Sequence, residues 1–393
     1  MPTERLYHHD SLLLGFEARV LAHAVWNGAP SVVLDHTAFY PESGGQMADR
    51  GLLAGHAVVD VQVDDEGVVH HLLQGADLPT VGGAVTGTID RARRRVHMAL
   101  HTGQHMLSRA LADVASADTV SSRLGESTCT IDVDREAVDE RRLAQAEDLV
   151  NSVIDDDVPV RAFFPDAAEL ASLPLRRAPK VRDHVRVVIV GDFDVTPCGG
   201  THCTRSAQVG LVRITGVERY KGKARVTFSA GPRARGELWR EVAVLRDLGR
   251  GFTCGPLDVP GGVDKLRREL TEAREALGQV RGRLADAIGL ELCAQATASG
   301  RAVAVLDDAG AELLRALATR ITAVPGAVAF LAGRGPEGMA VLVARSTTAT
   351  VDCGAFLKKA AAQAGGRGGG RPERAEGRLP ADADWPSLVA ALA

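Results

Sequence analysis

The spacing of apolar residues changes along the chain and predicts a different kind of structure in each part. In residues 1–90, short apolar runs at 31–34, 58–63 and 68–73 are separated by turn residues such as the glycine pair at 44–45. Short valine-rich runs bounded by turn residues are typical of strands. This part is therefore expected to form a small antiparallel β-barrel.

Residues 91–231 mix helical and extended spacing. Apolar residues at helical spacing predict a helix over 134–157, which ends before Pro159. Alternating segments predict strands at 185–190, 211–215 and 225–228. Strands packed against helices make an α+β domain, and the chain as a whole is assigned to the α+β class.

Residues 232–300 are expected to form a long helical arm. Apolar residues recur there at alternating spacings of four and three, at Leu266, Leu270, Ala273, Leu277, Val280 and Leu284. This is the heptad spacing of a coiled coil. The arm is either a dimerisation element or one half of an intramolecular hairpin with a 233–250 helix, and the pattern leaves both open.

Residues 301–393 are expected to form a small α/β domain. Apolar strands are predicted at 302–306, 327–331 and 340–344, and helices at 311–321 and 356–364. The glycine-rich run 365–371 has the composition of a flexible linker. Its arginines and the lysines just before it favour instead a contact with an RNA backbone, through Lys358, Lys359, Arg367 and Arg371.

Composition excludes several classes of protein. The net charge of −4 and the pI near 6.3 argue against a generally basic nucleic-acid binder, so any RNA contact must come from local patches. No apolar stretch approaches the roughly 20 residues that span a bilayer, and the N-terminus lacks an apolar signal region. Six dispersed cysteines are typical of reduced thiols, which indicates a cytoplasmic protein without membrane contact.

Two short motifs about a hundred residues apart carry the candidate chemistry. His101 and His105 stand four residues apart, so they lie on one face of a helix. Cys198 and His202 flank a glycine pair in a predicted loop, which can wrap closely around an ion. Three imidazoles and one thiolate suit Zn²⁺ above other common metals, so one zinc ion per chain is expected.

The metal site lacks the general base of a zinc protease. Such proteases carry glutamate directly after the first histidine, where this chain has Thr102. Chemistry here would depend on the metal itself, and a reactive ester is an easier target than an amide. A structural zinc closed by four protein ligands is the alternative, and spacing does not separate the two.

The remaining histidine pairs are expected to be ordinary surface or edge residues. Neighbouring residues of a strand point to opposite faces, so pairs such as His8 with His9, or His70 with His71, cannot easily chelate one ion.

Together these motifs resemble a known family. HTGQHMLSRAL and PCGGTH look like the editing domain of alanyl-tRNA synthetase and its free-standing relatives, the AlaX proteins. The stretch FYPESGGQ, residues 39–46, matches a third signature, and GGGRPE, residues 368–373, resembles the glycine-rich segment of the synthetase's C-terminal domain. The four motifs occur in the family's order.

The resemblance implies a function and further site residues. The family hydrolyses tRNA(Ala) that carries the wrong amino acid, chiefly serine. Gln46 stands at a position used for editing, Thr37 matches a threonine that contacts the serine hydroxyl, and Gly44 and Gly45 allow close approach to the substrate. Phosphate contacts are expected from the arginines that open the His101 helix, namely Arg91, Arg93 and Arg94.

The expected protein is a zinc-dependent, trans-acting deacylase of mischarged tRNA(Ala), without a nucleotide cofactor. The 38 residues before FYPESGGQ are too few for an ATP-binding region of a class II synthetase, so the chain is expected to discharge tRNA, not to charge it. The C-terminal domain would bind tRNA, and it or the arm would form a homodimer. The alternative is a non-catalytic RNA-binding module with a structural zinc.

Overall fold

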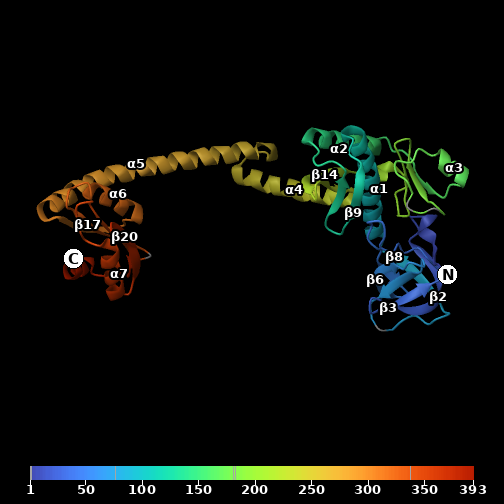
Figure 1. The fold of residues 1–393 in the computed structure, drawn as a ribbon, viewed down its shortest axis with the longest axis horizontal. Helices are drawn as coiled ribbons and strands as arrows, with labels where there is room; N and C mark the ends of the chain where they lie inside the picture. Colours follow the sequence, from blue (N-terminus) through green and yellow to red (C-terminus); the bar gives the residue numbers. More distant parts are fainter. Residues whose placement is uncertain (1, 76, 180, 182, 337) are drawn as a thin grey trace. The chain divides into compact units, whose positions relative to one another are not determined.

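The computed structural model describes residues 2–75, 77–179, 181, 183–336 and 338–393, and it divides the chain into two compact units, Met1–Asp247 and Leu248–Ala393. Helices and strands are mixed in both units (Figure 1), which confirms the predicted α+β class. Among the described residues, no helix combines the length and hydropathy that a bilayer crossing requires.

Six strands near the N-terminus form a closed barrel, hydrogen-bonded in the order β2-β3-β7-β6-β5-β8. Their bounds are β2 Gly15–Trp26, β3 Ala29–Leu34, β5 Gly51–Leu53, β6 His56–Val63, β7 Val69–Leu73 and β8 Ala84–Ile89. Inward-facing side chains such as Val20, Leu34 and Val61 are fully buried and form the barrel core. The alternation of buried and exposed positions in β2 and β8 is the expected pattern for strands with one face on a core.

The histidine pair in β7 corrects one prediction. His70 and His71 were expected at the surface, but they are 8% and 0% exposed. His70 bonds Ser31 in the neighbouring strand, and the His71 ring lies between the carbonyl of Val32 and the hydroxyl of Thr37. The His71 ring packs against Phe39 of the barrel core, and the His70 ring lies 4.9 Å from that of Trp26. These neighbours are brought together by the fold, and the local sequence does not reveal them.

A short N-terminal segment lies against the barrel. It contains β1 (Glu4–Arg5), which pairs in parallel with β4 (His36–Thr37), and a single 3₁₀ turn, Leu6–His8. Of the second predicted surface pair, His9 is exposed as expected, whereas His8 is partly buried and lines a cavity described below.

Helix α1 (Arg91–Ala115) leaves the barrel and runs beside the next sheet (Figure 1). It begins where the Asp90 carboxylate accepts hydrogen bonds from the backbone amides of Ala92 and Arg93, as an N-cap does. Its middle, from His97 to Ser108, is buried throughout. The helix therefore carries its polar residues through the protein interior, where each needs a partner.

Two sheets complete the first unit. The four-stranded sheet has the order β14-β15-β10-β9 and the three-stranded sheet the order β11-β12-β13. The strands are β9 Thr119–Leu124, β10 Cys129–Val133, β11 Val160–Phe163, β12 Val187–Val190, β13 Asp194–Pro197, β14 Val212–Tyr220 and β15 Lys223–Ala230. The predicted strands at 185–190, 211–215 and 225–228 fall in β12, β14 and β15.

Helix α2 (Glu140–Asp155) is shorter than the predicted 134–157. Asp139 accepts a hydrogen bond from the Arg142 amide, and this cap begins the helix six residues later than the apolar spacing suggested. A short α3 (Ala167–Ser172) follows β11, and α4 (Gly231–Phe252) contains the boundary between the two units.

After the last residues of α4, the second unit continues with a long helix. α5 (Val259–Ser299) has 41 residues, and this confirms the predicted helix over 266–284. The apolar positions of the heptad pattern are substantially exposed, for example Leu266 at 54% and Val280 at 60%.

A five-stranded sheet of order β16-β17-β18-β20-β19 follows α5. The elements are β16 Arg301–Asp307, α6 Ala311–Ile321, β17 Val328–Gly335, β18 Gly338–Arg345, α7 Cys353–Ala364, β19 Arg367–Arg371, β20 Arg374–Leu379 and α8 Trp385–Leu392. The linker interpretation of 365–371 is wrong, because β19 pairs with β20 over Gly368, Gly369 and Gly370. A Cβ on Gly368 would lie 2.9 Å from Leu357, so glycine lets α7 pack closely on this hairpin.

Candidate metal centre and adjoining cavity

Four side chains from two distant segments converge in the first unit. α1 supplies His101 and His105, and the loop after β13 supplies Cys198 and His202. Their ligating atoms all lie within 4.8 Å of one another, and the Cys198 Sγ is 3.4 Å from the Nε2 atoms of both His101 and His202. Tetrahedral zinc with ordinary bond lengths places nitrogen and sulfur ligands about 3.5 Å apart. The geometry and the donor set both fit zinc.

Two of the three imidazoles are held by a hydrogen bond at Nδ1, which leaves their Nε2 atoms free for a metal, whereas the Nδ1 of His105 has a carboxylate beside it but no hydrogen bond. The Nδ1 of His101 lies 2.7 Å from the Gln46 Oε1, and that of His202 lies 3.2 Å from the Thr102 hydroxyl. His105 faces the Asp194 carboxylate at 3.6 Å. Such partners orient metal-binding histidines and select the tautomer. Thr102, which stands where a protease has its glutamate, therefore supports a ligand.

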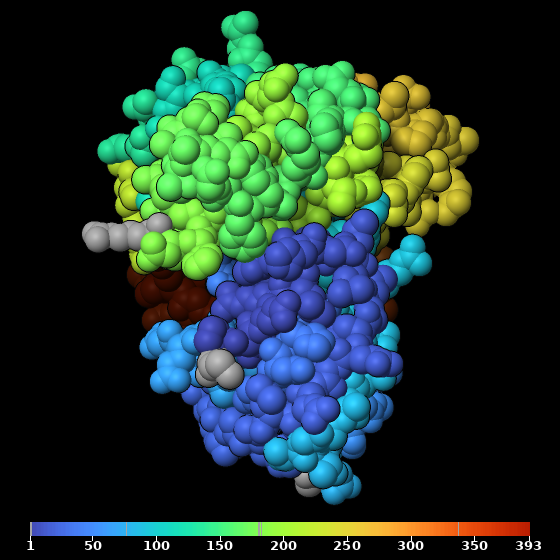
Figure 2. Space-filling model, turned by 90° about the vertical axis from the view of Figure 1, so that its right-hand side faces the viewer, coloured from blue at the N-terminus to red at the C-terminus, as the bar shows by residue number. Residues whose placement is uncertain are grey.

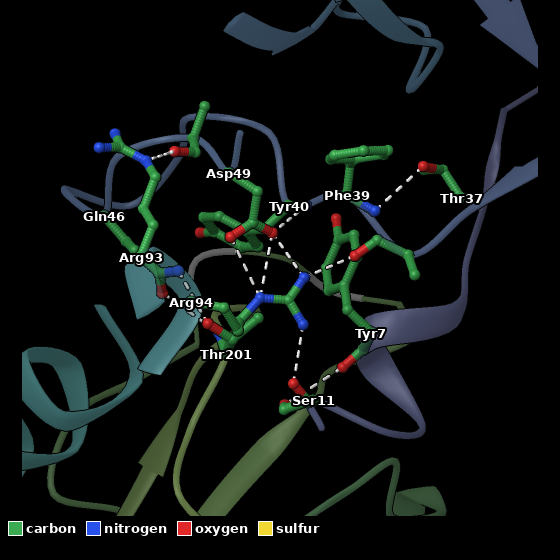
Figure 3. A network of polar contacts seen from close by, with 12 residues as sticks. Tyr7, Ser11, Thr37, Phe39, Tyr40, Gln46, Asp49, Arg93, Arg94 and Thr201 are labelled. Carbon is green, nitrogen blue, oxygen red and sulfur yellow. Dashed lines mark hydrogen bonds and ion pairs between the residues drawn. The ribbon is translucent and has the colours of Figure 1, made fainter. Parts of the chain in front are cut away.

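Gln46 contacts His101 on the side of the ring opposite the ligating Nε2 atom. It is fully buried, its Nε2 donates to the Thr201 hydroxyl at 2.8 Å, and its Oε1 also accepts from the Thr201 amide (Figure 3). These bonds fix the amide so that its oxygen faces His101. Gln46 joins the FYPESGGQ segment to the CGGTH loop and positions a ligand, without itself lining the cavity.

The electrostatics of the cluster favour the metal-binding protonation states of Cys198, His101 and His202. Burial alone would raise the pKa of the Cys198 thiol, but the surrounding imidazoles of His101, His105 and His202 hold it well below its ordinary value. Burial lowers the pKa of His202 to about 3 and also lowers that of His101. Burial would lower the pKa of His105 too, but Cys198 and Asp194 raise it above its ordinary value. A thiolate beside neutral imidazoles is the form that binds zinc.

Asp194 is buried, which by itself would raise its pKa, yet His105 and Arg176 hold that pKa at about 2. The carboxylate accepts from the Arg176 Nε at 2.7 Å and from the Thr196 hydroxyl at 2.8 Å. It therefore stays ionised and oriented beside His105.

The CGGTH loop is fixed by a buried arginine. The Arg186 Nη1 donates to the carbonyls of Cys198 and Gly200, at 3.0 and 2.9 Å, and its Nε donates to the carbonyl of His8. Gly200 is required by space, because a Cβ there would lie 2.2 Å from the His101 ring. The loop thus lies directly against the ligand that α1 provides.

Arg94 does not present its charge to a ligand. It is 1% exposed, and its guanidinium pairs with the equally buried Asp49 and donates to the carbonyls of Ser11 and Ala38 (Figure 3). The predicted phosphate contact is wrong for this residue, because its donors are consumed inside the protein. Its role is to attach α1 to the segment that contains Tyr40, whose amide donates to Asp49.

The other two arginines of α1 that were predicted to contact phosphate, Arg91 and Arg93, differ in exposure. Arg91 is exposed, so its proposed phosphate contact stays a prediction. Arg93 is half-buried, donates to the Ala48 carbonyl and pairs with Glu126.

Thr37 makes its hydrogen bonds to residues of the barrel and not to the metal cluster. It is fully buried, and its hydroxyl is 2.8 Å from the His71 Nε2 and accepts from the Phe39 amide. It is not among the residues that line the cavity. Its predicted contact with the serine hydroxyl stays a prediction.

A cavity of about 650 Å³ opens beside the metal cluster. Gly44 and Gly45 line it, as predicted for close approach, together with the ligands His101 and Cys198. Other lining residues come from the N-terminal segment, α1, β9, the residue after β11 and residues 177–179 and 183–186, and include Arg5, His8, Gln104, Ser122, Phe164, Arg177 and Arg186. Figure 2 shows the face on which the N-terminal residues, in blue, meet the 160–200 region, in green.

Burial lowers the pKa of the cavity-lining His8 to about 3. Its ring lies 5.6 Å from that of Phe164. This histidine therefore enters the cavity as a neutral ring.

In the second unit, the four predicted tRNA contacts are all exposed. They are Lys358 and Lys359 on α7 and Arg367 and Arg371 on β19.

Comparison with known families matches three parts of the chain. Residues 14–93 match the model for class II (A) tRNA synthetases, residues 185–227 that for the second additional domain of threonyl and alanyl tRNA synthetases, and residues 300–393 the DHHA1 domain. The alanyl-tRNA editing protein AlaX-L of Pyrococcus horikoshii is 29% identical over 96% of this chain and 95% of its own length. The chain belongs to the AlaX-type editing proteins.

The chain also resembles part of a longer enzyme. The alanine–tRNA ligase of Halorubrum lacusprofundi is 34% identical over 97% of this chain, and that of Archaeoglobus fulgidus is 33% identical over 96%. The chain spans 42% of the length of each ligase. A crystal structure of the C-Ala domain from Aquifex aeolicus alanyl-tRNA synthetase covers 23% of the chain at 24% identity, with a TM-score of 0.22.

Several residues of this AlaX-type site escaped prediction from sequence. Asp194 and Arg186 stand in segments that read as ordinary strand and turn, and Thr102 was noted only for not being glutamate. Their positions beside the ligands follow from long-range packing. One signal could have marked Thr102: it is a polar residue among apolar residues on a predicted buried helix, as Gln104 also is. The sequence holds no comparable signal for Asp194 and Arg186.

Proposed function

We propose that this AlaX-type chain is a trans-acting, zinc-dependent deacylase that hydrolyses the ester between a wrong amino acid, chiefly serine, and tRNA(Ala). The observation that carries the proposal is the convergence of His101, His105, Cys198 and His202 at the wall of a cavity that Gly44 and Gly45 also line. Because His101 and Cys198 belong to both the cluster and the cavity lining, a substrate in the cavity reaches the ligands.

Zinc bound there would supply Lewis-acid polarisation of the ester carbonyl or of a water. The chain's own residues supply orientation. Gln46 and Thr102 hydrogen-bond the rings of His101 and His202, and the Asp194 carboxylate faces His105 at 3.6 Å. Such supporting contacts typically contribute 10- to 100-fold in metal affinity or activity. Arg5 and Arg177 give the cavity lining positive charge, which suits the phosphates at the acylated end of a tRNA.

The decisive experiment measures hydrolysis of seryl-, glycyl- and alanyl-tRNA(Ala) by the purified chain before and after chelation. We expect rapid loss of the serine ester, slow loss of the alanine ester, and loss of activity on chelation that Zn²⁺ restores. Undiminished turnover by the metal-free protein would refute the metal mechanism.

A pair of cysteine variants tests the ligand assignment. Cys198→Ala removes a proposed ligand, whereas Cys203→Ala alters a neighbouring buried thiol whose pKa burial raises to about 11. We expect Cys198→Ala to lose zinc and hydrolysis while it keeps tRNA binding, and Cys203→Ala to keep all three.

The second candidate function is a non-catalytic tRNA-binding protein with a structural zinc. The complete set of four protein ligands favours it, since structural sites are usually closed in this way. It predicts that the parent chain hydrolyses none of the three esters and that Cys198→Ala unfolds the first unit.

A further inference from the structure

One wall of the cavity carries four aromatic rings in contact with one another, which we call the aromatic row. The His8 ring lies between the rings of Phe164 and Tyr7, at centroid distances of 5.6 and 4.7 Å, and Tyr7 lies 5.2 Å from Tyr40. All three pairs meet edge to face, an arrangement that aromatic pairs favour. Because all four residues line the cavity, the row is part of the surface that a bound substrate meets.

The members of the aromatic row differ in exposure. Tyr7 and Tyr40 are 1% and 3% exposed, and the Tyr40 hydroxyl donates to the carbonyl of Ser43, so both rings belong to the interior. Phe164 is 39% exposed, although its side chain is wholly apolar. It directly follows β11 and lines the cavity. Phe164 therefore has ring surface that a flat partner could cover.

The aromatic row is fixed close to the metal cluster. The Arg186 Nε donates to the carbonyl of His8. The Nη1 of the same guanidinium donates to the carbonyls of Cys198 and Gly200. The His8 Nε2 lies 3.9 Å from the position of a Cβ on Gly199, the residue after Cys198. An ester at the metal and the base of the same nucleoside are attached to one ribose, so a group that holds the base must lie this close to the ligand loop.

Positive charge lines the same cavity. Arg5 and Arg177 are among its lining residues, and the Arg177 Nη2 donates to the carbonyl of Pro197, directly before Cys198. Aromatic rings beside cationic groups are typical of sites for single-stranded nucleic acid, where bases stack on the rings and phosphates meet the charges. The acylated end of a tRNA is single-stranded, so it fits this chemistry.

We propose that Phe164 stacks on the terminal base of the acylated tRNA and that His8, packed against its edge, positions the ring. A base supplies a flat face of the size of a phenyl ring, whereas the serine part of the ester is too small and polar to cover one. The cavity volume of about 650 Å³ lies within the range of about 300–1,000 Å³ for small-ligand sites, so it admits a nucleoside with its ester. This inference rests on the proposed deacylase function and assigns the nucleoside part of its substrate.

The test combines a variant with a change in the substrate. Phe164→Leu keeps apolar bulk but removes the flat ring. The two substrates are seryl-tRNA(Ala) ending in adenosine and the same RNA ending in a ribose without its base, both prepared by ligating a chemically acylated dinucleotide to truncated tRNA. We expect Phe164→Leu to lower kcat/KM about tenfold on the first substrate, the lower end of what one base–aromatic stack contributes. On the second substrate its effect should stay within about twofold, since the partner of the ring is already missing.

Two further variants serve as controls. Trp239→Leu removes an aromatic ring that is 58% exposed on α4 and does not line the cavity, so it should leave kcat/KM unchanged on both substrates. Phe164→Trp keeps an aromatic face and should retain most of the rate on the substrate that ends in adenosine. Zinc content and circular dichroism of each variant show whether the metal site and the fold persist.

A loss confined to the substrate with the base, rescued by Phe164→Trp, supports the assignment. An equal loss on both substrates would mean that Phe164 acts on the cavity as a whole, and no loss on either would mean that it touches no base, so both results overturn the proposal. If the parent chain hydrolyses neither ester, the proposed function fails. Binding of the hydrolysis-resistant amide analogue of seryl-adenosine to the parent chain and to Phe164→Leu then decides the role of Phe164, and equal affinities would refute it.

Discussion

At the scale of single residues, the metal cluster depends on close packing around His101. The ring has Gln46 behind it at 2.7 Å and Gly200 beside it, where a methyl group would lie within 2.2 Å of the ring. The next glycine is different, because a Cβ on Gly199 would meet nothing nearer than the His8 ring at 3.9 Å. Two adjacent glycines therefore have distinct roles.

The two glycines give a matched test. Gly200→Ala must displace His101 or the loop, so we expect zinc affinity and deacylation to fall at least tenfold, as when a supporting contact of a metal ligand is lost. Gly199→Ala should keep both within about twofold, since its methyl group makes ordinary contact. Zinc competition titrations on both variants measure the effect, and equal losses would contradict the packing argument.

A second residue-scale consequence concerns His71 in the barrel. Burial lowers its pKa to about 4, against about 6.5 in an unfolded chain. Below pH 6.5 the unfolded state takes up this proton first, so the stabilisation is complete above pH 6.5 and is lost progressively down to pH 4.

We expect His71 to account for about 2 kcal/mol of the stability lost between pH 7 and pH 5. His71→Gln removes the titrating group, so its unfolding free energy should change less over this interval than that of the parent chain. Urea denaturation at both pH values measures the difference. Identical pH dependence in the two proteins would show that His71 does not titrate as described.

At the scale of elements, α1 connects the barrel to the metal site. It carries both histidine ligands and Gln104, and near its N-terminus the Arg94–Asp49 pair attaches it to the segment that leads to Gly44 and Gly45. Both partners are 1% exposed or less. The pair thus sets where α1 lies relative to the FYPESGGQ segment.

Arg94→Met should destabilise the first unit by about 3–5 kcal/mol, because it leaves Asp49 buried without a counter-charge. Arg91→Met, three residues earlier on the exposed surface, should change stability by less than about 0.5 kcal/mol. Unfolding free energies from urea titration compare the two. A small effect of Arg94→Met would mean that water reaches Asp49.

At the scale of the whole molecule, chemistry and the proposed tRNA contact belong to different compact units. The metal cluster and cavity lie in Met1–Asp247, whereas the exposed basic residues of α7 and β19 lie in Leu248–Ala393. Binding and hydrolysis should therefore be separable by mutation.

The double variant Lys358→Ala, Lys359→Ala should raise the KM for seryl-tRNA(Ala) and leave kcat nearly unchanged. The slope of log affinity against log salt should become shallower by up to about 0.9 for each lost phosphate contact. Lys265→Ala on α5, where the lysine pairs with Glu269, is the control. A fall in kcat with unchanged KM would contradict this separation.

The sequence determined much of this protein by itself. The proposed ligand set, the α+β class, the long α5 and the strands β12, β14 and β15 followed from spacing and residue type, because helical and strand periods and metal-donor chemistry are local properties.

Tertiary structure decided which polar residues face the site. Only in the folded chain does Arg94 pair with Asp49 and Thr37 bond His71. The fold likewise brings Asp194 and Gln104 beside the proposed ligands. The partners in these contacts are separated by up to about ninety residues, and burial forces each polar group to pair with whatever the fold brings near. No local pattern encodes that choice.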